Sequence, residues 1–119
     1  QISLSERWGM SMTLLDLRDL LKDIGPPVYH YHPGEKKIKD NKYIVWAEDS
    51  EGASGHADNK KTTQVVQGTI DYFTKTEFDP VVEQIQSALN SADIAWRLNS
   101  VQHEQDTGYI HYEWVWEMV

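Results

Sequence analysis

The first hydrophobic pattern along the chain has the spacing of a helix. Apolar residues fall at positions i, i+3, i+7 and i+10, and Leu20 widens the stripe that they form on one side. The stripe consists of Leu14, Leu17, Leu21 and Ile24. We therefore predict an amphipathic helix over roughly residues 13–24.

Residues that favour helix termini stand at both ends of this segment. Thr13 and Asp16 have the spacing of a capping box, in which each side chain accepts a free backbone N–H of the first turn. At the other end, Gly25 suits the left-handed C′ position, and Pro26 and Pro27 prevent continuation of the helix. The sequence thus predicts where the helix begins and ends.

The middle of the chain has the patterns of extended strands. Residues 28–31 are rich in β-formers and stop at the turn signal of Pro33 and Gly34. Residues 42–48 are apolar on both faces, as expected for a strand that is covered on two sides. A polar loop over residues 49–61 then leads into a long β-rich run over residues 62–75.

A second helix and a hairpin complete the pattern. Asp79 is placed as an N-cap with Pro80 at the first helical position, and Val82, Ile85 and Leu89 form the apolar stripe. The hairpin pairs residues 94–98 with residues 109–119 through a turn at 104–108. One face of its last strand carries an apolar row of Ile110, Tyr112, Trp114, Trp116 and Met118.

These elements define the predicted fold class. The order is α-β-β-β-α-β-β, and a mainly antiparallel sheet with two helices on one face would bury both helical stripes and the aromatic row. We expect a single α+β domain over residues 12–119, because 119 residues suit one hydrophobic core. Residues 1–11 are interpreted as a non-native or flexible extension, with Met10 or Met12 as the start.

The charge and composition narrow the function classes. The net charge of −8 disfavours tight nucleic-acid binding, which depends on Lys and Arg that neutralise phosphates, and the 11 basic residues are scattered. The absence of cysteine excludes a thiol nucleophile and sulfur-ligated zinc. No apolar run approaches the roughly 18–20 residues that cross a bilayer, so we expect no membrane partner.

Two histidines offer the best candidate metal ligands. His30 and His32 would point the same way in an extended chain, but zinc needs further converging ligands, and the spacing identifies none. An exposed polar strand face running into a turn is the simpler interpretation. A small metal- or ligand-binding domain that uses His30 and His32 remains the alternative hypothesis.

The sequence has no recognisable catalytic motif. No nucleophile is placed beside an activating base, and residues 52–55 lack the lysine and the length of a phosphate-binding loop. Paired carboxylates among the 19 acidic residues stay open as an acid–base device. We predict that the protein is not an enzyme and needs no cofactor.

The polar loop over residues 49–61 is a candidate for subunit contacts. Structureless loops of more than about 12 residues are uncommon in compact domains and are often functional. The candidate contact residues within it are Gly55, His56, Asp58, Asn59 and Lys60. The competing interpretation of this loop is a plain hairpin connection. A further hypothesis for the whole protein is a protein-binding regulator whose C-terminal strand adds to a partner's sheet.

The order of these segments resembles a known family. "YIVWAEDS", a polar loop closing with "ADNK", "QVVQGTIDYFTKTEFDPVVEQIQSALN" and a terminal aromatic strand are similar to the small tail completion, tail terminator or head–tail joining proteins of tailed bacteriophages and prophages. The resemblance spans about residues 12–118 and includes the helix start "MTLLDLRDLL".

The resemblance implies a structural role in the virion. Such a subunit assembles with itself into a ring, typically a hexamer, at the head-proximal end of the tail, where it contacts the tail tube and the head–tail connector proteins. DNA passes through the ring without specific binding, which suits an electronegative lumen. The protein would be made in the host bacterial cytoplasm and end in the virion tail. The family offers no catalytic residues to carry over.

Overall fold

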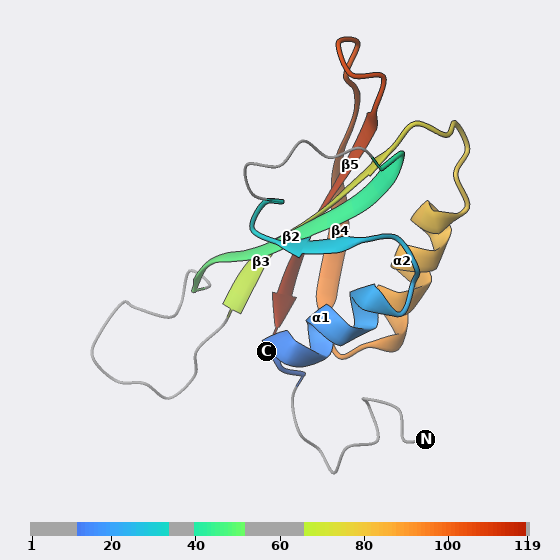
Figure 1. Ribbon diagram of the computed structural model, residues 1–119. Coiled ribbons are helices and arrows are strands. Elements are labelled where there is room, and N and C mark those ends of the chain that lie inside the picture. Colours follow the sequence, from blue (N-terminus) through green and yellow to red (C-terminus); the bar gives the residue numbers. More distant parts are fainter. Residues whose placement is uncertain (1–11, 34–39, 52–65, 119) are drawn as a thin grey trace.

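The computed structural model describes residues 12–33, 40–51 and 66–118 (Figure 1). The elements in chain order are α1 (Leu14–Lys22), β1 (Val28–His30), β2 (Lys42–Glu51), β3 (Val66–Thr74), α2 (Val81–Ser91), β4 (Ala95–His103) and β5 (Ile110–Met118). This order and the α+β class confirm the predicted fold. The predicted extension over residues 1–11 lies outside the described ranges.

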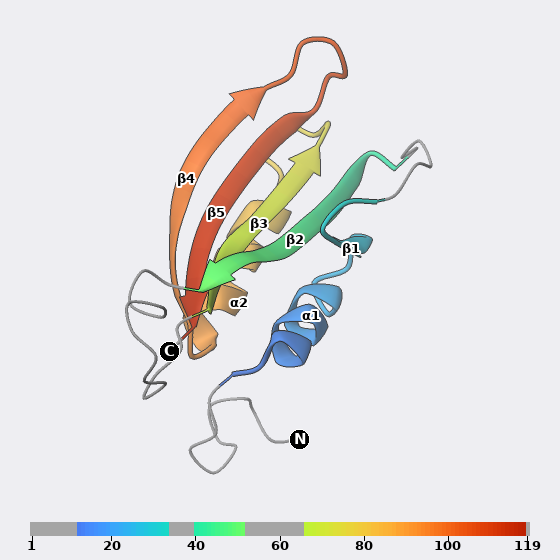
Figure 2. The same cartoon turned by 90° about the vertical axis from the view of Figure 1, so that its left-hand side faces the viewer.

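The strands form one five-stranded sheet with the spatial order β1-β2-β3-β5-β4. β1 pairs with β2 in parallel, and every other neighbouring pair is antiparallel, so the sheet is mixed and mostly antiparallel. β4 and the three-residue β1 are its two edge strands (Figures 1 and 2).

Both helices lie on the same side of the sheet, which we call the helix face (Figures 1 and 2). Their buried stripes pack against alternate residues of the central strands, as period-two strands and period-3.6 helices require. The buried core consists of Met12, Leu17, Leu21, Ile44, Trp46, Ile70, Tyr72, Ile85, Leu89, Trp114, Trp116 and Met118. The predicted helical stripes and the tryptophan row therefore meet in one core.

The start of α1 matches the prediction, and its end differs slightly. Thr13 and Asp16 form the capping box, with each side chain accepting the backbone N–H of the other residue. The helix ends earlier than expected, at Lys22, with Asp23 as its C-cap. Gly25 lies two positions beyond that cap with a φ of 132°, so it is not the left-handed C′ residue that the sequence suggested.

The start of α2 is shifted by one residue from the prediction. Pro80 occupies the N-cap position, and the helix begins at Val81. Asp79 still performs the capping role, because its Oδ1 accepts the backbone N–H of Val81 at 2.9 Å. A carboxylate can reach a free N–H of the first turn from just outside the helix.

The strand boundaries correct two predictions about the middle of the chain. β2 continues to Glu51, so residues 49–51 belong to a strand and not to the predicted loop. β4 runs from Ala95 to His103 and is about twice as long as the predicted segment 94–98. Both extensions are rich in polar residues, so the sequence does not show the apolar pattern of a strand there. Polar residues suit these positions because each lies where the sheet is open to solvent on at least one face.

Among the described elements, only the two helices cover β2, and they do so on one face. The helices cover only the helix face, and the opposite face, which we call the open face, carries Tyr43 and Val45. Neighbouring side chains shield these two residues: Tyr43 stacks on Phe73 with ring centroids 4.6 Å apart. The apolar character that suggested a second covering layer therefore belongs to a cluster within the face itself.

Candidate interaction surface

The structure places His30 against its own sheet. Its ring stacks on Trp46 at a centroid distance of 4.1 Å, and its Nε2 lies 2.7 Å from Oε1 of Glu48. β1 ends at His30, and Tyr31 has a φ of 76°, which interrupts the extended geometry before His32 is reached. The premise that both rings point the same way along a strand is therefore wrong.

Further groups bear on the metal hypothesis. The Tyr31 hydroxyl donates to Oε2 of the same Glu48 at 2.8 Å, so both carboxylate oxygens of Glu48 are already engaged. Across residues 12–33, 40–51 and 66–118, no three His, Asp or Glu side chains group closely enough to hold a metal ion. The predicted loop contacts Gly55, His56, Asp58, Asn59 and Lys60 lie outside these ranges.

The open face carries an aromatic cluster at the end nearest the β4–β5 turn. Tyr43 and Phe73 stack in parallel, and Tyr109 meets both rings edge-on. The Nζ of Lys75 lies 4.8 Å above the Tyr109 ring in a cation–π contact. Burial raises the pKa of Tyr43 to about 12, so its hydroxyl stays protonated. This cluster shields the open face without a covering layer.

A histidine with two acidic neighbours borders the aromatic cluster. His111 stacks on Phe73 at 4.2 Å, its Nε2 lies 2.7 Å from Oδ1 of Asp71, and its Nδ1 lies 3.5 Å from Oε2 of Glu104. The hydrogen bond to Asp71 raises the pKa of His111 above its ordinary value of 6.5, against the opposing effect of burial. The sequence alone does not reveal the pair of His111 and Asp71, because 40 positions separate the two residues.

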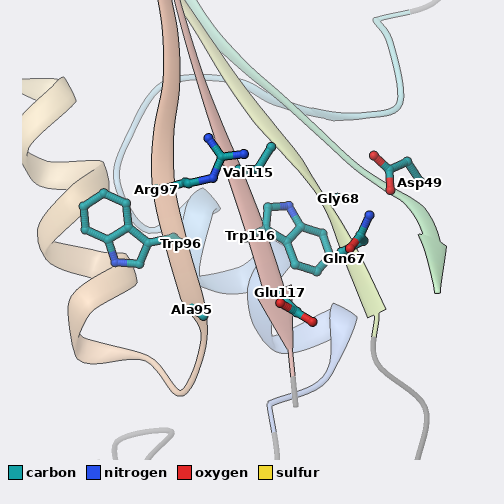
Figure 3. Close-up of a pocket in the computed structure, with 9 residues that line it drawn as sticks. All are labelled: Asp49, Gln67, Gly68, Ala95, Trp96, Arg97, Val115, Trp116 and Glu117. Carbon is teal, nitrogen blue, oxygen red and sulfur yellow. The ribbon is translucent and has the colours of Figure 1, made fainter. Parts of the chain in front are cut away.

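The other end of the open face is hollowed. A depression of about 330 Å³ lies across four strands, and Figure 3 shows the Arg97 side chain beside Val115. The residues that line it are Asp49, Gln67, Gly68, Ala95, Trp96, Arg97, Val115, Trp116 and Glu117. It is shallow and open, with carboxylates and one guanidinium along its walls, which suits contact with a polar chain better than enclosure of a small molecule.

β4 is an exposed edge strand with apolar side chains. Leu98 is 42% exposed and Val101 is 51% exposed, although both are on the helix face. Their rows of the sheet lie within the length of β3, since Leu98 is level with Ile70 and Val101 with Tyr72. They are exposed because β4 is the outermost strand of the sheet (Figures 1 and 2). Natural sheet edges are usually protected by charges, prolines, bulges or short strands, so the exposed apolar side chains of this long edge make it a candidate interaction surface.

The fold and this surface define the class of protein: an α+β domain with a mixed sheet, one covered face and a long free edge. Within the described part of the chain, neither helix has the length and hydrophobicity that a membrane crossing requires. Comparison with models of known protein families and with curated proteins finds no match.

Proposed function

We propose that this chain is a structural subunit of a phage or prophage tail. It acts as a tail completion or terminator protein that forms a ring at the head-proximal end of the tail and joins it to the head. Its partners are other copies of itself, the tail tube and the head–tail connector proteins. It is made in the bacterial cytoplasm and becomes part of the virion.

The observation that carries the proposal is the free edge at β4. An assembly subunit must expose surface that only another chain covers, and the outer edge of the nine-residue β4, with exposed Leu98 and Val101, supports such a role. The α+β fold that the family resemblance implies is also the fold of this chain. The shallow, open depression on the open face is also consistent with contact between chains.

The charge of the protein supports passage of DNA through such a ring. The open face carries Asp71, Glu113 and Glu117 along neighbouring strands, in a chain with a net charge of −8. Carboxylates that line a channel repel phosphates and keep the DNA from adhering.

The proposal is tested by deleting the gene from the phage or prophage that encodes it. Electron microscopy of the resulting lysate should show full heads separated from tails, and tails of abnormal length or without heads. Supply of the gene in trans should restore joined particles and infectious titre. Normal infectious virions from the deletion strain would overturn the proposal.

A further inference from the structure

The sheet has free edges on its two opposite sides, one along β4 and one along the last part of β2. Among the strands that the structure describes, β4 has no neighbour on the side away from β5. β1 pairs only with Ile44–Trp46 of β2, so within the described ranges no strand lies beside Ala47–Glu51 on the side away from β3. Each edge leaves backbone N–H and C=O groups available to another chain.

Strand registers place these two edges at one level. Glu48 is opposite Gly68, Gly68 is opposite Trp116, and Trp116 is opposite Trp96. One row of the sheet therefore runs from the free part of β2 to the first half of β4. A neighbouring copy at the same height would bring its free β2 edge beside residues 95–98.

Strand directions also agree across such a junction. β2 is antiparallel to β3, β3 is antiparallel to β5, and β5 is antiparallel to β4, so β4 runs opposite to β2. Rotation about a ring axis preserves the height and the up–down direction of each strand. β4 of one copy would therefore meet β2 of the next as an antiparallel pair, and the alternation would continue.

The charges of the two edges are complementary. β4 carries Arg97 and no carboxylate, whereas the free edge of β2 contains Glu48 and Asp49. Arg97 and Asp49 both line the depression on the open face, so they would lie on one face of a continued sheet. The opposite charges would meet at the junction and disfavour pairing of β4 with itself.

From these observations we propose that β4 of one copy pairs with the free β2 edge, Ala47–Glu51, of the next copy, so that one sheet continues from subunit to subunit. The inference rests on the proposed function and identifies the partner surface within the ring. Head-to-tail contacts of this kind close into rings when the rotation permits, whereas pairing of identical edges stops at a dimer.

The irregularity in β4 fits the stepped edge of the neighbour. β1 adds one strand beside Ile44–Trp46, so the neighbour's edge projects there and recedes from Ala47 onward. The pairing of β4 shifts register between Leu98 and Ser100, and such a bulge bends a strand. The second half of β4, with exposed Val101, is level with Ile44 and would reach the neighbour's β1.

Cysteine cross-linking in assembled particles tests the pairing, because the chain has no cysteine of its own. The deletion strain is complemented with Ala95→Cys, Asp49→Cys or both, and purified particles are treated with a short bismaleimide. We expect a ladder of linked subunits from the double variant alone. A matched control combines Asp49→Cys with Ser87→Cys, an exposed position on α2, and should give no ladder.

Charge exchange tests the same junction by infectivity. Arg97→Glu should lower the titre by about tenfold or more, because it places like charges together across the interface. Asp49→Arg alone should also lower the titre, and the combined variant should recover most of the loss. Arg18→Glu, which reverses an exposed arginine on α1, is the matched control and should leave the titre unchanged. Circular dichroism of each purified variant verifies folding.

The outcomes separate this inference from the proposed function. Abnormal particles from the deletion strain, rescued by the double-cysteine variant but without a ladder, would overturn the edge pairing and leave the tail role standing. Cross-linking by Ala95→Cys alone would show that β4 pairs with itself and would also overturn it. Normal virions from the deletion strain would overturn the tail role and, with it, the pairing.

Discussion

Replacement of Asp79 by alanine should be among the most damaging single changes outside the apolar core. Its Oδ2 accepts the hydroxyls of Tyr72 and Thr74, each at 2.6 Å, and lies 3.3 Å from Nζ of Lys42. Its Oδ1 accepts the backbone N–H of Val81. One carboxylate thus fastens the start of α2 to β2 and β3.

The magnitude follows from the groups that lose their partner. Tyr72 and Thr74 are fully buried, so their hydroxyls cannot turn to water when the carboxylate is removed. A buried polar group without a partner costs about 1–3 kcal/mol, and a lost helix cap costs about 1 kcal/mol. Thr74 keeps the backbone N–H of Thr76 as a partner for its oxygen, so we expect Asp79→Ala to lower the free energy of unfolding by about 3–5 kcal/mol.

Urea denaturation followed by circular dichroism measures this loss. Asp93→Ala, at an exposed acidic position after α2, is the matched control and should change stability by no more than about 0.5 kcal/mol. A double-mutant cycle with Tyr72→Phe adds a sharper test: Tyr72→Phe should cost less in the Asp79→Ala background, because it then removes an unpaired hydroxyl. Strictly additive effects, or a loss below about 1 kcal/mol for Asp79→Ala, would refute the reasoning.

The same contacts predict a dependence on pH. Burial alone would raise the pKa of Asp79, but the hydrogen bonds from Thr74, Tyr72 and the Val81 N–H outweigh it and lower the pKa below the ordinary 3.8. The contribution of Asp79 is therefore complete above pH 3.8 and is lost as the pH falls through the lowered pKa. The stability of Asp79→Asn should fall less steeply with acid than that of the unaltered protein, and equal slopes would contradict this assignment.

Three further predictions concern other parts of the sheet and its connections. The pKa of His111 is raised in the folded protein, so its protonated ring adds stability below pH 6.5, and this stability is lost as the pH rises through the folded-state pKa. His111→Gln should therefore reduce the change of the urea midpoint with pH over this range, and an unchanged pH profile would count against the Asp71 contact. Gly68→Ala should lower the free energy of unfolding by about 2 kcal/mol or more, because the added Cβ would run into the carbonyl oxygen of Ala47; a midpoint equal to that of Gln67→Ala would contradict this. Phe78 is 89% exposed with a φ of 57°, so Phe78→Gly should leave stability unchanged or raise it by up to about 1 kcal/mol, and a clear loss in thermal melting would reveal a contact of this ring.

Local patterns were sufficient for much of the fold. The capping box of Thr13 and Asp16, the stripe that includes Ile85 and Leu89, and the row that includes Trp114 each depend on residues a few positions apart. Helix caps and alternating strands are local devices, so a single sequence displays them directly. The element order and the α+β class follow from these patterns.

The candidate surface depended on contacts between distant positions. His111 contacts Asp71, which lies 40 positions earlier in the chain. Arg97 of β4 and Asp49 of β2 line the same depression, although β3 and β5 lie between their strands. His30 and His32 stand out in the sequence because only one residue separates them, but in the structure His30 contacts Glu48 and Trp46. Strand order and register bring such groups together, and neither can be inferred from spacing along the chain.

The exposed edge at β4 shows most clearly what the sequence determines and what only the tertiary structure decides. Alternation predicted that Leu98 would face inward, and it does lie on the helix face, yet it is exposed on the edge strand. In the same row of the sheet, α2 contacts Trp114 of β5 through Gln86. Hydrophobic periodicity determines which face a side chain joins, because the period belongs to the backbone of its own strand. Whether a position on that face is covered depends on where its strand lies in the sheet relative to the helices, which is decided only when the helices and the sheet pack together.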